Sequence, residues 1–257
     1  HRAWNIGLVS LGYKKIESDL IVRLGNKSYI EVETAFTALL PRRLKKSIAE
    51  KIVSFYINKL KTNPELHDKV EFEIVHNCYT PMTEDQLLEL KPILNGQEYK
   101  QFKESLKNLT QNIFRNYNSI KMKDLSSLDE LEKRRNQIIQ KNHNISLINK
   151  IVLAGNLIED ARKFGAPQFS RMARLAFIGN QYLKALVKKN VITEQDSDIY
   201  LTNIDTIASE LKKDFDSVLK NKLTIDEFKS IYGHLRPGTY DINKIPYDKD
   251  NSYFSVD

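Results

Sequence analysis

Apolar side chains recur every three or four residues along most of this chain, and this spacing limits the fold more than any other feature. From Pro41 onward it is the spacing of amphipathic helices, each of which turns one apolar stripe toward a core. The clearest stripes are Leu44, Ile48, Ile52, Phe55 and Tyr56; Tyr99, Phe102, Leu106, Leu109 and Ile113; and Tyr200, Ile204, Ile207, Leu211, Phe215 and Val218. The pattern predicts seven to nine helices.

Hydroxyl residues mark four predicted helix starts, because each can accept a hydrogen bond from the amide three residues later. The pairs are Thr83 with Gln86, Ser126 with Asp129, Thr193 with Asp196 and Thr224 with Glu227. Gln86 and Glu227 can also return the bond and complete a capping box. The predicted separators between helices are Pro64, Pro81, Pro92 and the stretch 121–127.

The first 40 residues differ from the rest, because residues 20–24 and 28–36 have the composition of strands with a natural turn at 25–27. In the second run, Ile30, Val32 and Thr34 alternate with polar or aromatic residues, as in a half-buried strand. The predicted fold class is therefore mainly α, a multi-helix domain with a small N-terminal β-hairpin. We predict a β-containing segment at 1–40 and one compact helical domain at 41–257, and leave a division near residues 80–95 open.

The composition is that of an ordinary globular protein, with 41% hydrophobic and 28% charged residues in 257. No apolar run reaches the roughly 18 residues that a membrane helix needs, and no signal peptide is recognisable. The start at His1 without an initiator Met indicates a piece excised from a longer protein. Cys78 is the single cysteine, so no internal disulfide can form, and we expect a cytoplasmic location.

The formal net charge of +7 raises the question of nucleic acid. Short basic clusters occur at 42–46 and 188–189, but most lysines lie among glutamates and aspartates, as on a solvated helical surface. A basic cleft for phosphorylated small molecules would explain the charge equally well. A basic nucleic-acid adaptor is therefore the weaker alternative.

Motifs of stand-alone enzymes are missing from the sequence: there is no phosphate-binding loop, no dinucleotide fingerprint and no serine elbow. The histidines lack metal-ligand spacing; they are His1, His67, His76, His143 and His234. Cys78 is predicted to be a small buried residue rather than a nucleophile. We predict no catalytic residue and no metal ligand in this chain.

Residues 232–242 read Tyr-Gly-His-Leu-Arg-Pro-Gly-Thr-Tyr-Asp-Ile, a shaped loop that would present His234 and Arg236. This stretch resembles the Y-G-H-x-R-P-G-T-Y-D-I segment of multidomain relatives of phosphoenolpyruvate synthase and pyruvate phosphate dikinase. Residues 164–178 resemble the G-x-x-P-F-x-x-x-A-R-x-A-F-I stretch of the same proteins. Weaker matches lie at 28–32 and 67–74, and all four occur in the family's order.

The resemblance implies the central helical region of an ATP-dependent phosphotransferase that works through a phosphohistidine. Neither the family's ATP-binding module nor its phosphohistidine module is recognisable here, so ATP and magnesium would belong to the parent enzyme and no cofactor to this chain. The expected partners are those two domains of the same polypeptide and a small-molecule phosphoryl acceptor. Pyruvate and the side-chain amide of glutamine, as in a glutamine kinase, are candidate acceptors. The isolated chain should be inactive.

In related antibiotic phosphotransferases the corresponding domain binds the acceptor, and cationic side chains suit that role. Arg171 and Arg174 lie three residues apart, after a helix start marked by Gly165 and Pro167. His234 and Arg236 could form a second cationic wall. The predicted substrate-binding residues are Arg171, Arg174, His234, Arg236 and Thr239.

Structural roles stay open beside this prediction. Arg171 and Arg174 could instead form salt bridges with Glu159 and Asp160, and His234 could be a core histidine. Tyr117, Tyr182 and Tyr200 are predicted to lie in the core. If the arginines serve only in salt bridges, the chain is a non-catalytic helical spacer between moving catalytic domains. The chain also has Pro246-Tyr247 where the family often has Pro-Arg, so an arginine contact at that point is in doubt.

Overall fold

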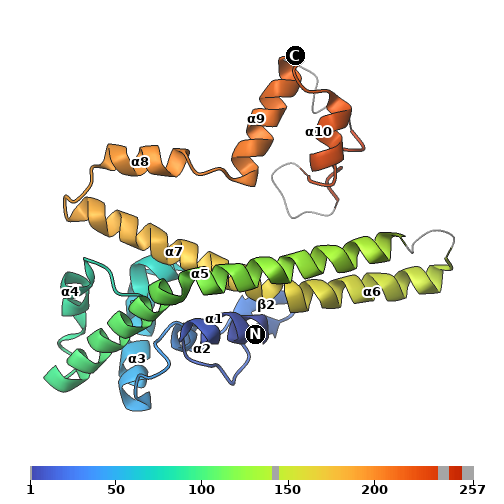
Figure 1. Ribbon diagram of the computed structural model, residues 1–257. Helices are drawn as coiled ribbons and strands as arrows, with labels where there is room; N and C mark the ends of the chain where they lie inside the picture. The colour runs from blue at the N-terminus through green and yellow to red at the C-terminus, as the bar shows by residue number, and fades with distance from the viewer. Residues whose placement is uncertain (1, 141–144, 237–242, 251–257) are drawn as a thin grey trace. The chain divides into compact units, whose positions relative to one another are not determined.

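A computed structural model describes residues 2–140, 145–236 and 243–250, and it is mainly helical with one small sheet (Figure 1). The predicted fold class is confirmed. The α-helices of the described residues are α1 (Arg2–Leu11), α2 (Val32–Ala38), α3 (Lys46–Thr62), α4 (Thr83–Gln86), α5 (Gly96–Gln140), α6 (Leu147–Phe164), α7 (Ala166–Lys188), α8 (Glu194–Thr202), α9 (Ile207–Leu219) and α10 (Ile225–Tyr232). They exceed the seven to nine that the sequence predicted. Three shorter helical segments are η1 (Pro64–Leu66), η2 (Val70–Ile74) and η3 (Leu87–Leu90).

The chain divides into two compact units, His1–Ile192 and Thr193–Asp257. This boundary differs from the predicted one at residue 40, and no division falls near residues 80–95. The N-terminal residues belong to the first unit because α1 packs along α7. Leu8 and Leu11 of α1 share a buried cluster with Ile178 of α7. At Gly7 the two helices approach so closely that a Cβ would lie 3.0 Å from the Pro167 carbonyl oxygen.

The hairpin consists of β1 (Ile21–Leu24) and β2 (Lys27–Ile30), paired antiparallel from Ile21–Ile30 to Leu24–Lys27. Gly25 occupies the turn with a φ of 60°. The predicted second strand is too long, because the Glu31 carboxylate caps α2 by accepting the Thr34 amide at 2.6 Å. Val32 and Thr34 are therefore helical, and the strand residues are exposed rather than half-buried.

The core of the first unit is built from the predicted stripes of α3 and α5. Ile52 and Tyr56 of α3 and Phe102 and Leu106 of α5 are almost fully buried in one cluster. Pro81 and Pro92 lie between helical segments, and Pro64 begins η1 directly after the end of α3, as expected of separators. Burial of these side chains is the main stabilising contribution to the unit.

Helix α5 runs without interruption through residues 121–127, so the predicted separator there is wrong and Ser126 caps nothing. Neither glycine nor proline occurs after Gly96 in this helix, and hence no residue forces a break. Its distal half pairs with α6 as a helical hairpin (Figure 1). Asp124, in the middle of the predicted break, is buried.

The predicted caps at Thr193 and Thr224 are confirmed, and each forms a complete capping box. Thr83 is not a cap; its hydroxyl accepts a hydrogen bond from the Thr80 amide instead. The third apolar stripe is divided among α8, the connection that holds Ile204, and α9, which starts at an unpredicted capping box formed by Thr206. A stripe alone therefore overestimated the helix length.

The second unit has a core of its own around α9 and α10. Val218, Phe228 and Tyr232 are buried together, and the Phe228 ring contacts Phe215 and Tyr247 edge-on. The Tyr232 hydroxyl donates to Asp214 at 2.8 Å. This aromatic cluster leads directly into the segment that begins at residue 232.

Candidate functional site

The start of α7 positions the two arginines that the sequence singled out. Gly165 ends α6 and is the N-cap of α7, and Pro167 stands in the first turn, as predicted. A Cβ at Gly165 would lie 2.9 Å from the Ala161 carbonyl oxygen, so the tight junction requires glycine. The junction turns one face of α7 toward α1 and the middle of α5.

Arg171 lies inside the first unit, 7% exposed, against the carboxylate of Asp124 on α5. Its Nε lies 3.0 Å from Asp124 Oδ1 and 2.9 Å from Oδ2, and its Nη2 also contacts Oδ1. Ser10 of α1 lies 3.5 Å from Nη1. The forked guanidinium therefore joins α7 to α5 through a buried ion pair and to α1 through a hydrogen bond.

Arg174, 3% exposed, lies on the same helix one turn further along. Its Nη2 donates to Glu71 of η2 at 2.6 Å, while the buried Nε and Nη1 have no hydrogen-bond partner among the described residues. The Tyr13 and Phe177 rings face the guanidinium, with centroids 5.7 and 5.6 Å from its carbon. The aromatic faces partly compensate for the missing hydrogen bonds.

The salt-bridge partners therefore differ from the expected Glu159 and Asp160. Glu159 pairs with Arg162 on the exposed surface of α6, and the half-buried Asp160 pairs with Arg134 of α5. Arg171 and Arg174 instead reach carboxylates on distant parts of the chain, which helical spacing could not identify. Both arginines therefore form their ion pairs within the first unit.

The other predicted binding residues belong to the second unit. His234 is exposed, so the alternative of a core histidine is wrong. Arg236 is half-buried, and its Nε donates to the Lys244 carbonyl oxygen at 2.8 Å. Thr239 lies outside the described residues. A cleft shared by these residues with Arg171 and Arg174 stays a prediction.

The tyrosines and the cysteine have different outcomes. Tyr117 and Tyr200 are exposed, so the prediction of a core position is wrong for them, whereas Tyr182 is half-buried and packs against the core of the first unit. The prediction of burial is confirmed for Cys78, whose thiol donates to Gln181 Oε1 at 2.9 Å. Burial raises the pKa of the Cys78 thiol to about 12, against the opposing charge of Arg174. The thiol is therefore protonated at neutral pH and is a poor nucleophile.

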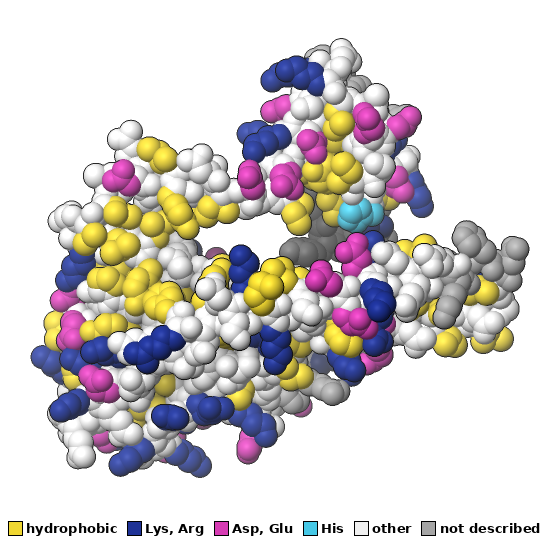
Figure 2. Space-filling model, in the orientation of Figure 1, with side chains coloured by type: hydrophobic (Ala, Val, Ile, Leu, Met, Phe, Trp, Pro, Cys, Tyr) yellow, Lys and Arg dark blue, Asp and Glu magenta, His cyan; other side chains and the backbone are white. Residues whose placement is uncertain are grey.

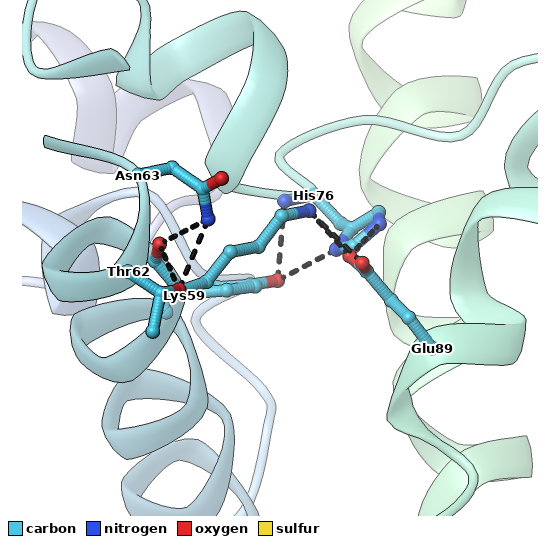
Figure 3. Close-up of polar contacts among 6 residues, drawn as sticks. Lys59, Thr62, Asn63, His76 and Glu89 are labelled. Carbon is cyan, nitrogen blue, oxygen red and sulfur yellow. Dashed lines mark hydrogen bonds and ion pairs between the residues drawn. The ribbon is translucent and has the colours of Figure 1, made fainter. Parts of the chain in front are cut away.

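A polar cluster that the sequence did not reveal lies between α3 and η3 (Figure 3). Lys59 Nζ lies 2.9 Å from both carboxylate oxygens of Glu89. His76 connects this ion pair to the core, with Nε2 3.4 Å from Glu89 Oε1 and Nδ1 3.0 Å from the Tyr56 hydroxyl. Thr62 and Asn63 bond the last turn of α3 beside it.

The imidazole of His76 is neutral at neutral pH, because desolvation and the nearby Lys59 charge lower its pKa to about 4. With the Tyr56 hydroxyl donating to Nδ1, the neutral ring carries its proton on Nε2. The Tyr56 hydroxyl in turn accepts the His76 backbone amide at 3.1 Å. Tyr56 and His76 are thus joined by two hydrogen bonds, and Glu89 lies beside the ring.

This cluster borders a hollow of about 200 Å³ that also reaches Gln181 of α7. A histidine with so low a pKa is a weak base near neutral pH, and its Nδ1 is held by the Tyr56 hydroxyl. The arrangement therefore holds α3, η3 and the chain between them together. No motif spacing could have found it, because its members lie on two helical segments and on the chain between them.

Within the part of the chain that the structure describes, no group of three or more His, Cys, Asp or Glu side chains could hold a metal ion. None of the described helices is long and apolar enough to cross a membrane. On the visible face, Lys and Arg side chains lie among acidic and apolar ones rather than in one continuous band (Figure 2). Comparisons with protein-family models, curated proteins and solved structures gave no match.

Proposed function

We propose that this chain is the central helical scaffold of a phosphoenolpyruvate synthase-like phosphotransferase. The observation that carries the proposal is the role of the 164–178 segment, which resembles that family. Its two arginines form buried ion pairs with Asp124 and Glu71, on two other elements of the first unit. Arginines that are committed to buried ion pairs favour a rigid scaffold for neighbouring domains over an acceptor pocket at these two residues.

Acceptor binding within this proposal falls to the second resembling segment. His234 is exposed and has no carboxylate partner among the described residues, and Arg236 uses its Nε on a backbone carbonyl. The two terminal nitrogens of Arg236 could still face an anionic or amide-bearing acceptor. ATP and magnesium would be bound by other domains of the parent enzyme, which would pass phosphate through a phosphohistidine.

The acceptor role is tested by thermal unfolding of the chain with pyruvate, phosphoenolpyruvate or glutamine. A ligand that binds only the folded state raises the melting temperature in proportion to the logarithm of its concentration. We expect a rise with one acceptor that Arg236→Ala abolishes and the exposed control Arg162→Ala leaves intact. A flat response to every compound would limit the chain to the spacer role.

The phosphotransferase assignment needs a separate test, on the natural polypeptide that contains this chain. Incubation with [γ-³²P]ATP and magnesium should give an acid-labile phosphohistidine outside residues 1–257. The isolated chain should neither hydrolyse ATP nor acquire the label. A stable label on His234, or no labelling of the natural polypeptide, would contradict the proposal.

A further inference from the structure

Three arginines surround a hollow in the first unit that the proposed function does not use. Its volume is about 470 Å³, within the usual range of small-ligand pockets. It is lined by Leu11, Gly12, Pro41, Arg42, Arg43, Ser105, Asn108, Leu109, Asn112 and Arg115. No acidic side chain is among them.

The backbone around the hollow is fixed by hydrogen bonds between distant segments. The Arg42 amide donates to the Gly12 carbonyl oxygen at 2.8 Å, and Lys14 donates to Leu40 at 2.9 Å. Gly12 has a φ of 105°, and a Cβ there would lie 2.9 Å from Leu109 Cδ1. Glycine thus lets the end of α1 lie directly against α5, and the positions of Arg42 and Arg43 follow from that contact.

The third side of the hollow is a polar stripe on α5. Ser105, Asn108, Asn112 and Arg115 recur at helical spacing on one face, while Leu109 between them is buried. The floor is apolar, because Leu11 and Leu109 are 1% and 6% exposed. A ligand would therefore find cations, amide groups and a small apolar surface together.

The three guanidinium groups have no carboxylate partner among the described residues, unlike Arg134, Arg171 and Arg174. The three cations that line this hollow repel each other, and an anion bound between them relieves the repulsion. Guanidinium groups match phosphate oxygens in pairs, and nearby amides can bond hydroxyl groups. We propose that this hollow, the three-arginine site, binds a phosphorylated small molecule with a hydroxyl-bearing body.

The test is isothermal titration of the whole chain with ribose 5-phosphate and with ADP, using ribose and adenosine as uncharged counterparts. We expect at least one phosphorylated probe to bind and neither counterpart to do so. Arg115→Ala and the pair Arg42→Ala/Arg43→Ala should each weaken binding about tenfold or more. These side chains are exposed, so the variants should fold normally, as circular dichroism can check.

Arg162→Ala is the matched control, because Arg162 is an exposed arginine of the same unit outside the hollow. Its affinity should equal that of the unchanged chain. Failure of both phosphorylated probes to bind, or equal weakening by Arg162→Ala, would overturn the proposal. Binding of a single-stranded oligonucleotide alone, with affinity falling steeply with salt, would overturn it in favour of a nucleic-acid contact.

The three-arginine site contains none of Arg171, Arg174, His234 and Arg236. Failure of the phosphorylated probes to bind there would leave the acceptor test at Arg236 unaffected. Failure of the acceptor test would likewise leave the three-arginine site untouched.

Discussion

At the scale of single residues, the first unit keeps several charged groups in its interior by pairing them. A buried guanidinium costs several kcal/mol of desolvation, which is offset only where geometry and hydrogen bonds are good. Arg171 meets this condition with two nitrogens on Asp124, whereas Arg174 leaves two nitrogens unbonded. We infer that the Arg171 pair specifies how α5 and α7 align, while Arg174 depends more on its aromatic neighbours.

Removing one partner of the Arg171–Asp124 pair should destabilise the first unit strongly. Asp124→Ala leaves a buried, unpaired guanidinium, and we expect a loss of about 3–5 kcal/mol in the free energy of unfolding. The control Asp129→Ala removes an exposed carboxylate from the same helix and should stay within about 0.5 kcal/mol. Urea unfolding followed by circular dichroism measures both. Equal losses in the two variants would contradict a special role for the pair.

The neutral state of His76 predicts a dependence of stability on pH. Its pKa is lowered from 6.5 to about 4 in the folded chain, so the unfolded state binds the proton more readily. The contribution of the neutral His76 to the free energy of unfolding is complete above pH 6.5 and is lost as pH falls toward 4. It amounts to about 3 kcal/mol in total. Melting temperatures between pH 4 and 7 should therefore fall more steeply for the unchanged chain than for His76→Gln. Parallel curves would show that other groups dominate.

At the scale of elements, local sequence signals identified helices well and their ends less well. The stripes of α3 and α5 gave the core residues, because a helix facing a core must repeat its apolar side chains. Ser126 followed by Asp129 has the pattern of a cap, yet α5 continues through it. A capping pattern only permits a start, and the packing of Asp124 against Arg171 favours continuity there.

The candidate site illustrates the same limit of local signals. Gly165 and Pro167 correctly placed the start of α7, because their backbone preferences act locally. The partners of Arg171 and Arg174 lie 47 and 103 residues away along the chain, and no periodicity links them. The His76 cluster and the three-arginine site likewise combine separate elements. Such groups emerge only when tertiary packing is known.

Two of the predicted caps, one that forms and one that does not, can be compared by the same substitution. Thr224→Ala removes a complete capping box at the start of α10 and should cost the second unit about 1 kcal/mol. Ser126→Ala replaces an exposed residue inside α5 and should be neutral or slightly stabilising, because alanine has the higher helix propensity. Thermal unfolding of both variants measures the difference. A loss at Ser126 as large as at Thr224 would indicate that α5 starts there after all.

At the scale of the whole molecule, the two compact units differ in the size of their cores. The first unit buries many large side chains, including Tyr13, Tyr56 and Phe102. Among the described residues of the second unit, the buried hydrophobic side chains are Val218, Phe228 and Tyr232. A domain of about 60 residues buries only about 60% of the surface of its unfolded chain and is correspondingly marginal. We therefore expect the second unit to open at a lower free energy than the first.

Native-state hydrogen exchange tests this expectation directly, because it reports the opening free energy of each segment. Amides of α9 and α10 should exchange faster than those of α3 and α5. Phe228→Ala, which removes a fully buried ring, costs about 3–5 kcal/mol. It should abolish protection in α9 and α10 and leave α3 and α5 unchanged.

Ile52→Ala is the reciprocal variant, since Ile52 is fully buried in the first unit. It should lower the protection of α3 and α5 by about 2–5 kcal/mol and leave the α9–α10 pair unaffected. Loss of protection in both units from either substitution would mean that the chain unfolds as a single cooperative body. A scaffold that carries a separable second unit requires the opposite result, in which each substitution acts only on the core that contains it.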